Sequence, residues 1–138
     1  MAQPGWPPLD ADHANRDVAV LTVDDQACFR DVLRDMIEAT AGFVLVGEAC
    51  SGEEALSAVE RLAPELVLMD VRMPGMDGVA ATRAIITRCP RTVVVLISAE
   101  DPELAPGIEA LSEAVARVRK QHLRPQVLRD LWAQANRN

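Results

Sequence analysis

The chain has 138 residues, of which 49% are apolar, and it carries a formal net charge of −7 at pH 7. This length and composition suit one domain with a single packed core and exclude wholesale disorder. The acidic balance argues against non-specific nucleic-acid binding, and no apolar run approaches the ~20 residues that a membrane-spanning helix needs.

The N-terminal stretch 1–16 is predicted to be a flexible tail, because proline, glycine and polar residues dominate it. It lacks the basic and then apolar order of a signal peptide. The three cysteines, Cys28, Cys50 and Cys89, show no metal-type spacing. We interpret them as reduced thiols that are buried or half-buried, and we expect a cytoplasmic protein.

Five apolar runs of strand length follow the tail. The expected strands are residues 18–23, 43–49, 66–69, 92–97 and 114–119. The third run ends at Asp70, and turn residues (Pro74, Gly75, Asp77 and Gly78) follow it. The fifth run is unusually polar for a buried strand.

Segments of helical character separate these strands. The first has apolar residues at helical spacing from Phe29 to Ile37, and the second begins with Ser51 and Glu54 in the form of a capping box. The others are expected at residues 79–88, at residues 101–112, and from Pro125 to the C-terminus. The helix over 101–112 is a weak prediction because proline and glycine lie inside it.

This alternation predicts an α/β fold with a doubly wound, parallel, five-stranded sheet and helices on both faces. We expect one domain over residues 17–135, with 136–138 as the C-terminal end. Neither G-x-G-x-x-G after the first strand nor G-x-x-x-x-G-K-[ST] occurs, which argues against a dinucleotide or nucleotide site.

Polar side chains stand where four of the predicted strands end. Asp24 and Asp25 follow the first strand, Asp70 the third, Ser98 the fourth and Lys120 the fifth. The carboxyl ends of parallel strands share one edge of the sheet, so these groups can converge. Three neighbouring carboxylates repel one another, and oxygen ligands of this kind suit Mg²⁺.

The same groups suit a phosphoryl ligand. A carboxylate such as Asp70 can attack phosphorus and form an aspartyl phosphate. Mg²⁺ and Lys120 would offset the charge on the transferring oxygens, and Ser98 would donate a hydrogen bond. Singly, each residue has a structural explanation as a helix cap, a turn residue or a surface group. Their joint placement at the strand ends favours the functional interpretation.

Four segments resemble the receiver domain of two-component response regulators. They are Val23–Asp25, Leu68–Gly78, Ile97–Ala99 and Lys120. The resemblance covers about residues 17–135 and matches in order and spacing. It implies a flavodoxin-like (βα)5 fold with strand order 2-1-3-4-5.

The resemblance also implies residue roles. Asp70 would be the phosphoacceptor. Asp25 and Asp70 would ligate Mg²⁺ with the backbone carbonyl of Arg72, and Asp24 would act directly or through water. Ser98 and Lys120 would contact the phosphoryl group. The donor would be a sensor histidine kinase or a phosphotransfer protein, and the chain would be no enzyme beyond assisting its own phosphotransfer and dephosphorylation.

The chain departs from the receiver pattern in one region. Arg117 stands where receivers usually have an aromatic switch residue, Gln121 where they have proline, and Ser112-Glu113 where they have Ala-Gly. We expect a trans bond before Gln121, since a non-proline cis bond costs ~3 kcal/mol. These changes predict an intact reaction centre and an altered face formed by the fourth helix, fifth strand and fifth helix.

Arg72 and Glu100 each lie two residues beyond a site residue, and we expect them to flank the entrance and tune the lifetime of the phosphoryl group. The leading hypothesis is a stand-alone receiver whose altered face contacts other proteins or a second copy, without direct DNA binding. A piece of a longer regulator would look the same. The alternatives are a docking module independent of phosphate and, less favoured, an aspartyl-phosphate phosphatase. The latter lacks its second aspartate, since Arg72 occupies that position.

Overall fold

The computed structural model describes residues 17–111 and 115–136. The strands are β1 (Val18–Val23), β2 (Phe43–Ala49), β3 (Leu66–Asp70), β4 (Val93–Ser98) and β5 (Ala116–Arg119). The α-helices are α2 (Ala27–Glu38), α3 (Gly52–Leu62), α4 (Gly78–Arg88) and α5 (Pro125–Asn136). The predicted tail 1–16, the first residue of the predicted fifth strand and the Ser112-Glu113 change lie outside the described residues.

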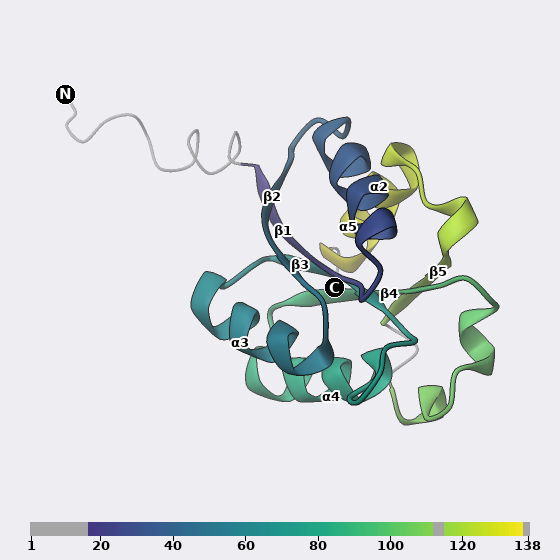
Figure 1. Cartoon of the computed structure of the whole chain (residues 1–138). Coiled ribbons are helices and arrows are strands. Elements are labelled where there is room, and N and C mark those ends of the chain that lie inside the picture. Colours follow the sequence, from purple (N-terminus) through teal and green to yellow (C-terminus); the bar gives the residue numbers. More distant parts are fainter. Residues whose placement is uncertain (1–16, 112–114, 137–138) are drawn as a thin grey trace.

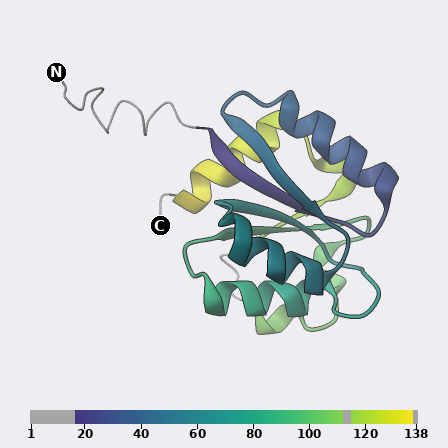
Figure 2. The ribbon, with the colours of Figure 1, turned by 60° about the vertical axis from the view of Figure 1, so that its left-hand side comes forward.

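All strand pairs are parallel, in the order β2-β1-β3-β4-β5. Helices α2 and α5 cover one face of the sheet, and α3 and α4 cover the other (Figures 1 and 2). The doubly wound, flavodoxin-like prediction is therefore confirmed. Among the described residues, no helix combines the length and apolarity that crossing a membrane requires.

The central strand β3 is buried along its whole length, which explains why its sequence is continuously apolar until Asp70. Because side chains alternate along a strand, it contributes to two apolar layers. Val67 and Met69 pack in the layer beneath α3 and α4. Leu66 and Leu68 pack in the layer beneath α2 and α5.

The predicted helix over residues 101–112 is wrong. The structure has two short 3₁₀ helices instead, η1 (Pro102–Leu104) and η2 (Ile108–Ala110). Pro106 has no backbone N–H to donate, and Gly107 adopts φ +82°, so an α-helix cannot continue through this pair. Three apolar side chains still anchor the segment: Ala105, Ile108 and Leu111.

Two smaller expectations also fail in part. Cys28 and Cys50 are exposed rather than buried, and only Cys89 is half-buried. Cys28 lies on the solvent side of α2, and Cys50 lies in the connection to α3, beyond the sheet. In the capping box, Ser51 Oγ accepts from the N–H of Glu54 at 3.1 Å as expected. The Glu54 carboxylate, however, accepts from the N–H of Cys50 instead of the N–H of Ser51.

Candidate functional site

The register of the sheet sets Asp24 and Asp70 level with each other. Val23 of β1 pairs with Met69 of β3, and each aspartate is the next residue along its chain. The two carboxylates therefore emerge from neighbouring strands at the same edge. Val23 and Met69 are both fully buried, so the two aspartates follow directly from the packed core of the sheet.

The same alignment extends across the sheet. Asp70 pairs with Ile97, so Ser98 lies one position further along β4. Ser98 in turn pairs with Arg119 of β5, and Lys120 follows as the first residue of η3 (Lys120–His122). Successive strand ends thus deliver acids, a hydroxyl and an amine to one edge.

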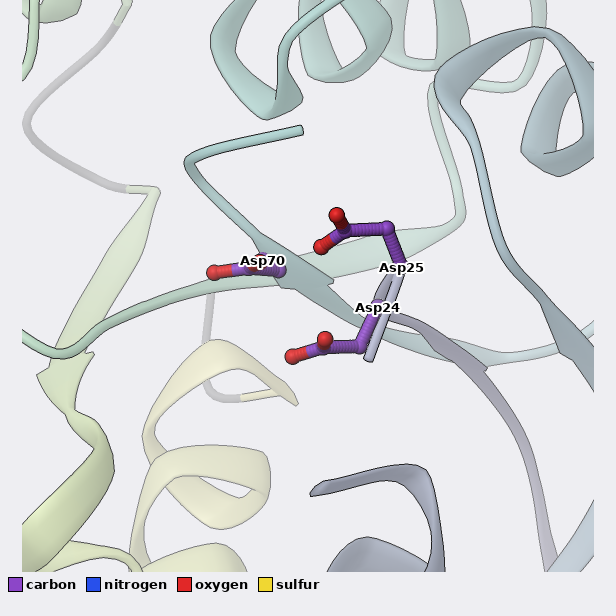
Figure 3. Close-up of side chains that lie close together, drawn as sticks. All are labelled: Asp24, Asp25 and Asp70. Carbon is purple, nitrogen blue, oxygen red and sulfur yellow. The ribbon is translucent and has the colours of Figure 1, made fainter. Parts of the chain in front are cut away.

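Three carboxylates gather where β1 and β3 end (Figure 3). Oxygen atoms of Asp24, Asp25 and Asp70 all lie within 4.8 Å of one another. Asp24 is fully buried and Asp70 is 5% exposed, whereas Asp25 is exposed. A cluster of hard oxygen donors with one open side fits Mg²⁺, which keeps several waters while binding one or two carboxylates.

The turn after Asp70 is folded tightly against the strand end. Gly78 N–H donates to Val71 O at 2.9 Å, and a Cβ at Gly78 would come within 2.1 Å of the Asp70 carbonyl oxygen. Only glycine fits at this close approach. Asp77 then begins α4 by accepting from Ala80 N–H at 2.8 Å. These contacts hold the loop that follows Asp70.

Lys120 reaches this acidic cluster from β5. Its Nζ lies 2.9 Å from Asp24 Oδ2 and 3.6 Å from Asp70 Oδ1, with the side chain only 15% exposed. The ammonium also lies over the ring of Phe29, 4.1 Å from the ring centroid. The resting partner of Lys120 is therefore Asp24, and Asp70 is within reach.

The pKa of the Asp70 carboxyl is raised to about 6, chiefly by burial and next by the nearby charge of Asp24. Lys120 and a hydrogen bond from the Arg72 backbone lower that pKa, but they do not cancel the effect of burial. A cation bound to the cluster would favour the ionised form. The cluster has three carboxylates and only one amine, so it suits a bound cation whose charge would offset the remaining negative charge.

Ser98 is buried at the end of β4, one position beyond the residue that pairs with Asp70. Its hydroxyl oxygen accepts from the N–H of Glu100 at 3.2 Å. The predicted entrance residues, Arg72 and Glu100, form an ion pair with each other, and each side chain is more than half exposed. The sequence indicated their positions but not this pairing, because they belong to loops after different strands.

The altered region is organised by a charged contact. Arg117 Nη1 lies 2.9 and 3.1 Å from the two carboxylate oxygens of Glu103, and the Arg117 side chain is only 13% exposed. This contact joins β5 to η1. Within the described residues no peptide bond is cis, in agreement with the trans bond expected before Gln121.

Sequence reasoning missed one contact that supports the acids. Arg30 Nη1 donates to the backbone carbonyl of Asp24 at 2.7 Å, and Arg30 Nε lies 3.6 Å from Glu48 Oε1. Glu48 also pairs with Arg34 at 2.7 Å. Arg30 could have been noticed as a cation on the helix that follows the two aspartates. The pairing of Glu48 with Arg30 could not be predicted, because Glu48 belongs to another strand and is distant in the sequence.

The chain is similar to known proteins in both sequence and fold. A family model described as the response regulator receiver domain matches residues 20–129. The chain is 39% identical over 100 residues to a protein-glutamate methylesterase/protein-glutamine glutaminase of Natronomonas pharaonis, a match that covers 72% of this chain and 28% of that protein. A relative of the same description from Myxococcus xanthus is 35% identical over 112 residues, covering 81% and 32%.

Solved structures match nearly end to end. The response regulator domain of Thermotoga maritima CheB is 31% identical with a TM-score of 0.73, and the match covers 88% of this chain and 98% of that one. The signal receiver domain of NarL from Mycobacterium tuberculosis is 30% identical with a TM-score of 0.77 and the same coverage. The chain thus spans about three tenths of the first curated relatives' length but nearly all of these single domains.

Proposed function

Because the chain belongs to the response regulator receiver domain family, we propose that it is a phosphorylation switch in which Asp70 accepts a phosphoryl group. The observation that carries the proposal is the position of the Asp70 carboxylate, which lies beside two further acids and 3.6 Å from the Lys120 ammonium. The donor is a phosphohistidine on a sensor histidine kinase or a phosphotransfer protein. The switch comprises residues 17–135, with 1–16 as a tail and 136–138 as the C-terminal end.

In the transfer, an Asp70 carboxylate oxygen forms a bond to phosphorus while the phosphorus–nitrogen bond of the donor breaks. The electron pair of that bond stays on the imidazole, which takes up a proton. Asp70 must be ionised to attack, and a bound cation would favour that ionised form against the burial that raises the pKa of Asp70. Asp24, Asp25, Asp70 and the Arg72 carbonyl would hold Mg²⁺, which supplies charge neutralisation at the oxygens.

Lys120 and Ser98 supply the remaining phosphate contacts. Lys120 can exchange its Asp24 oxygen at 2.9 Å for a phosphoryl oxygen, because Asp70 is already 3.6 Å away. A hydroxyl can accept and donate at once, so Ser98 can keep its contact with Glu100 while donating to the phosphoryl group. In this proposal the chain has no enzymatic activity beyond assisting its own phosphotransfer and dephosphorylation.

The Arg72–Glu100 ion pair tunes the lifetime of the phosphoryl group by narrowing the approach of hydrolytic water. Both side chains are exposed, so the pair is worth only ~0–1 kcal/mol. Arg72→Ala and Glu100→Ala should each change the dephosphorylation rate by a factor of up to about 5 and leave labelling intact. Decay at the wild-type rate in both variants would remove this role.

Phosphorylation changes protein–protein contacts at the face formed by η1, β5 and α5, including contacts with a second copy. The Arg117–Glu103 pair replaces the aromatic residue that receivers usually carry, so the switch must work through a charged contact here. The same observation favours a second candidate function, a docking or dimerisation module whose face is fixed by this pair whatever the state of Asp70.

One experiment separates these functions. The protein is incubated with Mg²⁺ and acetyl phosphate, and its intact mass and the hydrogen exchange of α5 are measured. A gain of one phosphoryl group in the wild type and none in Asp70→Ala, with altered exchange, supports the switch. Labelling without any change in exchange or elution supports the docking module. No labelling of the wild type contradicts the phosphoacceptor role.

A further inference from the structure

The ammonium of Lys120 rests on an aromatic face. Its Nζ lies 4.1 Å from the centroid of the Phe29 ring, well inside the roughly 6 Å over which a cation is attracted to a ring. The Lys120 side chain is 15% exposed, so water screens this attraction only weakly. The Phe29 ring is itself packed against the apolar layer beneath α2 and α5.

The ring gives Lys120 a support that does not depend on the carboxylates that hold its ammonium. Lys120 follows the short strand β5, whose residues are half-buried or exposed, and it begins the 3₁₀ helix η3. Its side chain has four rotatable bonds, and two carboxylates attract its ammonium, Asp24 at 2.9 Å and Asp70 at 3.6 Å.

An aromatic ring is suited to this position for a chemical reason. It attracts the ammonium without offering an oxygen ligand, so it does not compete with the acids for a cation. It also stays in place when the carboxylates change partners. Phe29 lies next to Arg30, which donates to the Asp24 carbonyl, so the start of α2 contacts both the acids and the amine of the site.

We infer that Phe29 is a positioning residue whose ring holds the Lys120 ammonium beside Asp70 while the ammonium exchanges Asp24 for a phosphoryl oxygen. The inference rests on the proposed function, since the exchange requires a phosphoryl group. The ring–ammonium contact exists without phosphate and can be measured separately.

The contact is tested by NMR of the unphosphorylated protein. A ring below the ammonium shifts the ε-methylene proton resonances of Lys120 upfield. We expect this shift in the wild type, its loss in Phe29→Leu, and its retention in Phe43→Leu. Phe43 is a matched control because it packs in the same layer, against Trp132, with ring centroids 6.5 Å apart. Identical Lys120 resonances in wild type and Phe29→Leu would overturn the inference.

The positioning role is tested by the rate of labelling with acetyl phosphate at saturating Mg²⁺. Phe29→Leu should slow labelling about 3- to 10-fold, Phe29→Tyr should restore most of the rate, and Phe43→Leu should leave it unchanged. In a Lys120→Met background, Phe29→Leu should cause no further loss. An equal loss in both backgrounds would show a general packing effect and contradict the inference. Absence of labelling in the wild type would instead overturn the proposed function.

Discussion

The ends of β1 and β3 are built differently from the region where η1 lies beside β5. All five residues of β3 are buried, and Asp24 and Asp70 leave their strands in matched register. By contrast, β5 has four residues, none of them buried. The exposed carboxylate of Glu103 in η1 joins η1 to β5 by pairing with Arg117. The three carboxylates are thus mounted on the core, whereas β5 and η1 are joined by an ion pair in addition to the apolar side chains that anchor β5 and residues 105–111.

The largest expected effect is at the amine of the reaction centre. Lys120→Met should slow labelling by acetyl phosphate about 10- to 100-fold, because a hydrogen bond to a charged group is worth ~1.5–3 kcal/mol. Lys120→Arg keeps the charge and should lose less. Labelling by Lys120→Met at the wild-type rate would show that the ammonium contacts only Asp24 and has no part in transfer.

A second prediction uses the burial of Asp70. Its folded pKa of about 6 exceeds the unfolded value near 3.9, so its stabilising contribution is complete below about pH 4 and is lost as pH rises through 6. Without Mg²⁺, Asp70→Asn should therefore be more stable than wild type at pH 7, by up to about 3 kcal/mol. Urea unfolding in a chelator at pH 4 and pH 7 measures this difference, and a difference independent of pH would contradict it.

A third prediction concerns the support behind the acids. Arg30→Met removes the donor to the Asp24 carbonyl and should weaken Mg²⁺ binding about 3- to 10-fold, measured by calorimetry. Arg34→Met is the matched control, since Arg34 pairs with Glu48 on the same face of α2 without an observed contact to Asp24. Equal weakening in both variants would point to a general charge effect.

The smallest effect on chemistry is expected in the altered face. Glu103→Gln breaks the Arg117 ion pair and should speed hydrogen exchange across residues 102–111. The labelling rate should stay within about twofold of wild type, because exposed ion pairs contribute ~0–1 kcal/mol. A large loss of labelling in Glu103→Gln would erase the distinction between the two regions.

The strands and the acidic edge were predictable from the sequence for a physical reason. A strand buried on both faces must be continuously apolar, so Leu66–Met69 marks the centre of the sheet, and a carboxylate at its end must lie at the sheet edge. Gly78 likewise indicates from its own position in the sequence that the loop after β3 is tight. The roles of the site residues stay predictions.

Contacts between distant segments were not predictable. The Phe29 ring was interpreted only as part of an apolar helix face, yet it meets Lys120, 91 positions along the chain. The Arg72–Glu100 pair likewise depends on how two loops approach. The helix predicted over residues 101–112 failed for a local reason. Pro106 and Gly107 interrupt an α-helix, and the helical propensity of the other residues does not outweigh them.

The central claim is that Asp70, and no neighbouring acid, takes the phosphoryl group. After incubation with Mg²⁺ and acetyl phosphate, borohydride reduces an aspartyl phosphate to homoserine, and peptide mass spectrometry locates that residue. We predict homoserine at position 70 and none at positions 24 and 25. Homoserine at either of those positions, or at none of the three in protein that gained mass, would contradict the account.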